Sequence, residues 1–163
     1  MTLLGANHTD LGATFTTRGG REVVDHYGRP AVAHRAVRNG VGIIEMGYGI
    51  ITIEGDDRIE YVDNIVSNRV PTDNDIVEDW SSKVFIQDVE ITDASDAFGV
   101  FGVHGPQSTE KIASVLNHAG APEPELTFER GSMGDGGVTV VASDNPTGEE
   151  GYEVICGADD AEV

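Results

Sequence analysis

The amino-acid sequence predicts a domain that combines helices with strands. Residues 85–92 and 151–156 alternate apolar and polar side chains, which is the period of a half-buried strand. Between them, Ile112, Val115 and Leu116 recur at the spacing of one face of a helix. With 163 residues the chain is long enough to enclose a sizeable core within one domain.

The first part of the chain is expected to contain an arm, a helix and a bent strand. Residues 1–29 are rich in Gly and Thr and show no sustained period, so we expect an arm with short extended pieces. Residues 30–39 should form a helix, because Pro30 suits its first position and an Asn-Gly pair suits its end. Residues 41–54 form an extended apolar run that internal glycines should bend. The main domain is expected to span residues 30–163.

The second part is expected to alternate helices and strands. One helix should run from Gly55 to about Val66 and bury one stripe, and another should cover residues 106–119. Residues 131–137 are glycine-rich and are expected to form a flexible turn, after which residues 138–143 should pair with residues 151–156. A strand is also expected over Phe98–His104. The stripe of the first helix comprises Ile59, Val62, Ile65 and Val66.

The charge balance is strongly acidic and narrows the choice of partners. The chain has 29 Asp and Glu residues against 10 Lys and Arg residues, for a formal charge of -19. Binding to nucleic acids or anionic membranes relies on basic patches, so neither is expected as a partner. No apolar run approaches the roughly 18 residues of a membrane span, and the polar residues 1–10 do not resemble a signal peptide.

The acidic residues are scattered along the chain, and only Lys83 and Lys111 are lysines. Such a surface resembles that of salt-adapted cytoplasmic proteins of the halophilic archaeal type, because about 1 M salt shortens the Debye length to about 3 Å and screens self-repulsion. An ordinary acidic protein is the alternative interpretation. Cys156 is the single cysteine, which excludes an internal disulfide and fits a reducing cytoplasm.

Common catalytic and metal-binding motifs are not found. No two histidines stand at a metal-ligand spacing, and no Gly-x-Ser-x-Gly nucleophile motif occurs. His34 is expected on the surface of its helix, and we expect no metal site. The five histidines are His8, His26, His34, His104 and His118.

Residues 145–156 are the most informative stretch. Glycines bracket a pair of acids and lead into an alternating strand, so a tight turn can hold a carboxylate at the mouth of a sheet. An ionised carboxylate accepts two adjacent N–H groups, as an aminopyrimidine ring presents them. The alternative is a surface hairpin whose acids are merely solvated.

Residues 147–153, Thr-Gly-Glu-Glu-Gly-Tyr-Glu, resemble the Tyr-Thr-Gly-Glu-x-Gly-aromatic-Glu signature of the glycine cleavage T-protein family, the folate-dependent aminomethyltransferases and their folate-binding relatives. Residues 41–54 resemble that family's Gly-Leu-x-Asp-x-Ser-x-x-Gly strand, with Glu45 near the family's acid and Tyr48 near a residue of its folate pocket. His104 stands where the family has Gln and is expected to be structural.

This resemblance implies an α+β fold in which an antiparallel sheet carries helices on one face. It implies binding of tetrahydrofolate and transfer of a one-carbon unit to it from an aminomethyl group held on a lipoylated carrier protein. The implied folate-binding residues are Glu149, Glu153, Tyr152 and Tyr48.

The sequence departs from the family in two places. Pro146 replaces a Tyr, and no counterpart exists for the Gly-Gly-x-x-x-Asp-Asp hairpin that carries the family's catalytic Asp, so no catalytic residue is assigned. Deleting central strands would leave backbone groups unpaired, which favours an incomplete chain that lacks this hairpin and the C-terminal barrel domain. Three interpretations stay open: an aminomethyltransferase, a folate-binding relative in iron-sulfur assembly or amine demethylation, and a non-catalytic interaction module.

Overall fold

The computed structural model describes residues 2–66, 88–123, 127–143, 148 and 150–161. The chain divides into two compact units. The first unit comprises Met1–Gly49 and Ser95–Val163, and the second comprises Ile50–Ala94.

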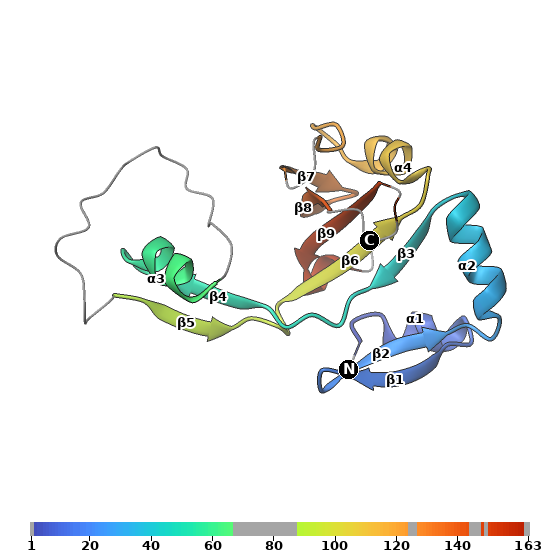
Figure 1. Cartoon of the computed structure of the whole chain (residues 1–163), viewed down its shortest axis with the longest axis horizontal. Coiled ribbons are helices and arrows are strands. Elements are labelled where there is room, and N and C mark those ends of the chain that lie inside the picture. Colours follow the sequence, from blue (N-terminus) through green and yellow to red (C-terminus); the bar gives the residue numbers. More distant parts are fainter. Residues whose placement is uncertain (1, 67–87, 124–126, 144–147, 149, 162–163) are drawn as a thin grey trace. The chain divides into compact units, whose positions relative to one another are not determined.

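The first unit is built on a five-stranded antiparallel sheet with strand order β3-β6-β9-β8-β7 (Figure 1). The central strand, β9, pairs with β6 on one side and with β8 on the other, which confirms the predicted pairing of residues 138–143 with residues 151–156. The mixture of helices with antiparallel strands agrees with the predicted α+β class. The strands are β3 (Gly42–Glu45), β6 (Phe98–His104), β7 (Phe128–Met133), β8 (Gly136–Ala142) and β9 (Gly151–Gly157).

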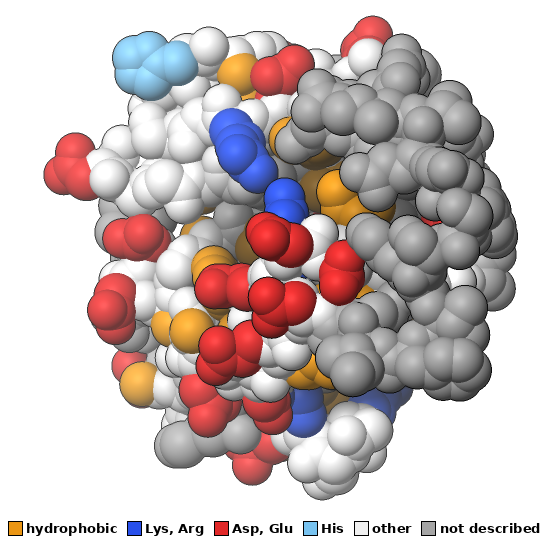
Figure 2. All heavy atoms as spheres, turned by 90° about the vertical axis from the view of Figure 1, so that its left-hand side faces the viewer, with side chains coloured by type: hydrophobic (Ala, Val, Ile, Leu, Met, Phe, Trp, Pro, Cys, Tyr) orange, Lys and Arg blue, Asp and Glu red, His pale blue; other side chains and the backbone are white. Residues whose placement is uncertain are grey.

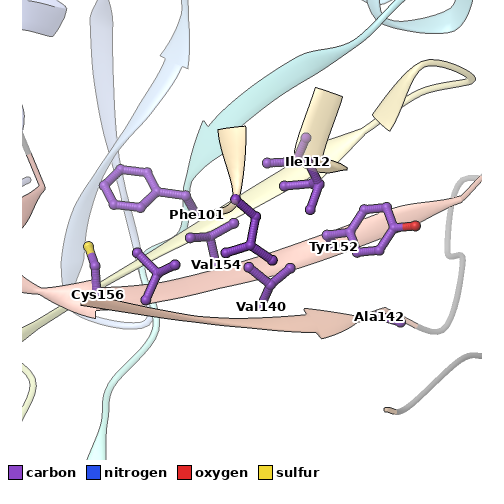
Figure 3. Close-up of a cluster of buried hydrophobic side chains, with 10 residues drawn as sticks. Phe101, Ile112, Val140, Ala142, Tyr152, Val154 and Cys156 are labelled. Atoms are coloured by element: carbon purple, nitrogen blue, oxygen red, sulfur yellow. The ribbon is translucent and has the colours of Figure 1, made fainter. Parts of the chain in front are cut away.

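The core lies between one face of this sheet and α4 (Ser108–Val115) (Figure 3). Alternate residues of β9 enter it, and they meet residues of β6 and β8 that stand opposite them in register. From the helix, Ile112 and Leu116 are 2% and 5% exposed, whereas Val115 is half-exposed. The helical stripe is therefore confirmed for two of its three members. The helix is shorter than the predicted residues 106–119 because Leu116 already has an extended backbone.

The N-terminal residues are more ordered than an arm of extended pieces. The hairpin β1 (Thr14–Arg18) and β2 (Arg21–His26) turns at two glycines with positive φ, Gly19 and Gly20. It is preceded by α1 (Gly5–Asp10), a helix that the sequence did not predict. After the hairpin, α2 (Pro30–Asn39) has the predicted bounds, and no residue of it is buried, His34 included.

The apolar run over residues 41–54 divides between the two units, because β4 (Ile51–Glu54) pairs with β5 (Glu90–Asp93) in the second unit. The expected strand over residues 85–92 is described only from residue 88. The same unit contains α3 (Arg58–Ile65), where a helix was predicted. Its stripe is not buried as expected: Ile65 is 60% exposed, and Ile59 and Val66 are also exposed.

The glycine-rich residues 131–137 are mostly strand, so the prediction of a flexible turn over all of them is wrong. Only Gly134 and Asp135 form the turn, and Gly131 belongs to β7 while Gly136 and Gly137 belong to β8. Position 131 requires glycine, because the Cβ of any other residue would lie 2.6 Å from the carbonyl oxygen of Asn117. Close packing, and not flexibility, explains this glycine.

Acidic side chains dominate the charged groups on the face of the molecule drawn in Figure 2. This agrees with the formal charge of -19. Among the described helices, none is both long and apolar enough to cross a membrane.

Candidate functional site

Two of the predicted folate-binding residues meet on the sheet face opposite the core. The hydroxyl of Tyr48, which follows β3, donates a hydrogen bond of 3.3 Å to Oε1 of Glu153. Glu153 lies on the central strand directly across from Gly102, and its side chain is half-buried. A strand alternates its side chains between two faces, so Glu153 points away from the buried Tyr152 and Val154.

Tyr152 lies on the other face and is only 2% exposed. Its hydroxyl is 2.7 Å from Oγ1 of Thr109 on α4, and Thr109 also donates to the Glu150 carboxylate. Burial raises the pKa of the Tyr152 hydroxyl, and the nearby carboxylates of Glu150 and Glu123 raise it further, against the lowering effect of the Thr109 bond. Tyr152 therefore anchors β9 to α4, and its side chain lies on the sheet face opposite that of Glu153.

Glu149 lies outside the described residues, and so does Pro146. The neighbouring Gly148 has a φ of 75°, which favours glycine and agrees with a tight turn before β9. Of the four predicted folate-binding residues, the structure thus brings Tyr48 and Glu153 together and places Tyr152 on the opposite face.

His104 shares the face of Glu153, one step along the sheet. His104 is paired across strands with Gly151, and Gly102 is paired with Glu153. A Cβ on Gly102 would lie 2.8 Å from Nε2 of His104, and a Cβ on Gly151 would lie 2.6 Å from Nδ1. The two glycines therefore leave the space that the imidazole ring fills, a relation that becomes visible only once the strand register is known.

A second cluster of polar side chains joins the N-terminal helix to the sheet. The Glu45 carboxylate accepts hydrogen bonds from the backbone N–H groups of Leu3 (2.7 Å) and Leu4 (3.3 Å) and from Nε2 of His8 (2.9 Å). The other ring nitrogen of His8 lies 2.8 Å from the hydroxyl of Tyr27. Burial raises the pKa of Tyr27, and the Glu45 charge adds to this.

In this cluster Glu45 has a structural role, because its carboxylate joins β3 to the N-terminal residues. The Glu45 side chain is 9% exposed, and its carboxylate binds the backbone of the two residues that precede α1 and the His8 side chain within that helix. The sequence indicated Glu45 but not His8 or Tyr27. The hydrogen bonds of this cluster join residues that lie 19 to 42 positions apart, and no local sequence pattern predicts them.

The described ranges contain no group of three His, Cys, Asp or Glu side chains placed to hold a metal ion. The thiol of Cys156 is buried in the core, and burial raises its pKa, which disfavours the reactive thiolate.

Comparison with known proteins points to one class of enzyme. The aminomethyltransferase of Corynebacterium jeikeium (strain K411) is 25% identical over 219 residues, covering 99% of this chain and 56% of that protein. The aminomethyltransferase of Staphylococcus haemolyticus (strain JCSC1435) is 23% identical over 200 residues, covering 98% of this chain and 55% of that protein. No protein-family model matches the sequence.

The chain spans about half the length of the curated relatives it matches. Both alignments are longer than the 163 residues of the chain, so the relatives contain internal positions without a counterpart here. At these identities the chain is a distant relative of proteins named aminomethyltransferase.

Proposed function

We propose that this chain is the tetrahydrofolate-binding part of an aminomethyltransferase of the glycine cleavage type. The observation that carries the proposal is its similarity to two aminomethyltransferases along nearly its whole length. The pairing of Tyr48 with Glu153 supports it, because these residues were singled out through the family signature and meet on one sheet face.

In this proposal the Glu153 carboxylate accepts two adjacent N–H groups of the pterin ring. Hydrogen bonds to a charged group contribute about 1.5 to 3 kcal/mol each when they are partly shielded from water. The Tyr48 hydroxyl holds Oε1 of the carboxylate, which limits its rotation before the ligand binds. The donor and acceptor set therefore fits the aminopyrimidine edge of folate, with Glu149 as a second candidate acid.

The chain's contribution to the reaction is binding and orientation. When bound, tetrahydrofolate supplies the nitrogen atoms that take up the one-carbon unit. Holding the pterin by Glu153 would fix these atoms in position, and a correctly oriented reactant is a major source of rate acceleration. A lipoylated carrier protein is the proposed partner that presents the aminomethyl group.

A second function, folate binding without aminomethyl transfer, is favoured by one observation. The hairpin with the family's catalytic Asp has no counterpart in the sequence, and both aligned relatives contain positions that this chain lacks. Folate-binding relatives in iron-sulfur assembly or amine demethylation would fit this loss. Release of ammonia from an aminomethylated lipoyl carrier, measured with tetrahydrofolate present, distinguishes the transferase from such a relative.

Calorimetric titration of 5-formyltetrahydrofolate into the full chain in molar KCl tests the binding site. We expect Glu153→Gln to weaken binding by about tenfold or more, because the amide has only one acceptor oxygen and its NH2 group would face one of the two N–H groups of the ring. Glu149→Gln is measured in parallel, and Glu129→Gln on the exposed part of β7 is the matched control. Binding that neither Glu153→Gln nor Glu149→Gln weakens would make this face structural, and absence of binding by the unaltered chain would refute the proposal.

A further inference from the structure

We infer that His104 is a third ligand-binding residue of this face, and that it recognises the oxo group of a pterin beside the N–H groups that Glu153 accepts. The inference rests on the proposed function and extends it to the choice between pterins. Its basis is the juxtaposition of His104, Gly102 and Glu153 on adjacent strands.

The imidazole of His104 lies beside Gly102, which faces Glu153 across the two strands. Nε2 is 2.8 Å from the point where a Cβ on Gly102 would stand, and Gly102 is the cross-strand partner of Glu153. Directly paired positions on one face have Cβ atoms about 4.5 to 5.5 Å apart. The ring of His104 therefore stands next to the base of the Glu153 side chain.

The hydrogen-bonding capacity of His104 is not used within the part of the chain that the structure describes. Its Nδ1 is buried and has no hydrogen-bond partner there. Because Nδ1 is buried against Gly151, Nε2 is the ring nitrogen that a ligand on this face would meet. His104 also requires two glycines beneath it, so the fold accommodates a half-buried imidazole on a face that already holds Tyr48 and Glu153.

The chemistry of the pterin edge matches this arrangement. The amino group and the ring N–H are the two donors for a carboxylate, and the oxo group adjoins that ring N–H. In the tautomer with its proton on Nε2, His104 donates a hydrogen bond at the same face. Glu153 would accept the hydrogen bonds of the amino group and the ring N–H, and His104 would donate to the oxo group beside them. This arrangement is complementary to the oxo form of the ring and not to its 4-amino analogue.

The test compares ligand binding by His104→Ala and His104→Gln with that of the unaltered chain. We expect His104→Ala to weaken binding of 5-formyltetrahydrofolate about tenfold and His104→Gln, which keeps an N–H donor, to restore most of it. The preference for folic acid over aminopterin, which carries an amino group in place of the oxo group, should fall in His104→Ala. A purely structural role would leave that preference unchanged.

His34→Ala, on the exposed face of α2, is the matched control, and thermal unfolding verifies that each variant is folded. Binding within twofold of the unaltered chain in folded His104→Ala, while Glu153→Gln still weakens it, would overturn the role of His104 and leave the proposed function intact. Absence of folate binding by the unaltered chain would overturn both.

Discussion

Truncation of Leu116 is the sharpest test of the packing between α4 and the sheet. Leu116 is 5% exposed and closes the C-terminal end of α4, where it packs against Gly131 of β7. Leu116→Ala removes three carbon atoms, worth about 2.4 kcal/mol at about 0.8 kcal/mol per methylene. The cavity left behind adds to this, so we expect the free energy of unfolding to fall by about 2 to 5 kcal/mol.

Leu11 offers a closely matched control. It occupies the same position at the end of α1 that Leu116 occupies at the end of α4, but it is 71% exposed. Leu11→Ala should change the free energy of unfolding by less than about 0.5 kcal/mol. Urea denaturation followed by circular dichroism measures both variants, and equal midpoints for the two would show that Leu116 is not part of a packed core.

Three further predictions follow from charge and burial. The melting temperature should rise between low salt and molar KCl because salt screens the formal charge of -19; a flat or falling trend would contradict this. The pKa of Tyr152 is raised in the folded state, so its contribution to stability is complete below about pH 10 and is lost as the pH rises through the raised pKa. Tyr152→Phe should therefore lessen the loss of unfolding free energy at alkaline pH. If the variant lost unfolding free energy with pH as steeply as the unaltered chain, this prediction would be wrong. Glu45→Gln should cost about 1 to 3 kcal/mol by disturbing the acceptor of Leu3, Leu4 and His8, and it should speed proteolysis within residues 2–13; unaltered cleavage there would speak against the contact.

The elements with local sequence signals were predicted best. Pro30 and the Asn-Gly pair define both ends of α2, and the apolar run of β6 defines Phe98–His104, so both elements have the predicted bounds. In contrast, α1 is held by Glu45, which lies about 40 positions further along the chain. Contacts of that kind leave no periodic pattern in the sequence, so the helix could not be foreseen.

The candidate site was only partly predictable for a related reason. Tyr48 and Glu153 are 105 residues apart, and only a family resemblance could suggest that they belong together. The alternation of β9 was available from the sequence, and it already implied that Tyr152 and Glu153 face opposite sides. The place of His104 above two glycines required the strand register, which the sequence does not specify.

The strand order has a consequence for how the protein is made. β9 is the central strand of the sheet, yet it follows the other four in the sequence, and it joins the pair β3–β6 to the pair β7–β8. During synthesis the edges of β6 and β8 that pair with β9 therefore stay unpaired until residue 157 has left the ribosome. Long-range pairing of this kind slows folding, and the mutual repulsion of acidic chains would help to keep the unfinished sheets of neighbouring molecules apart.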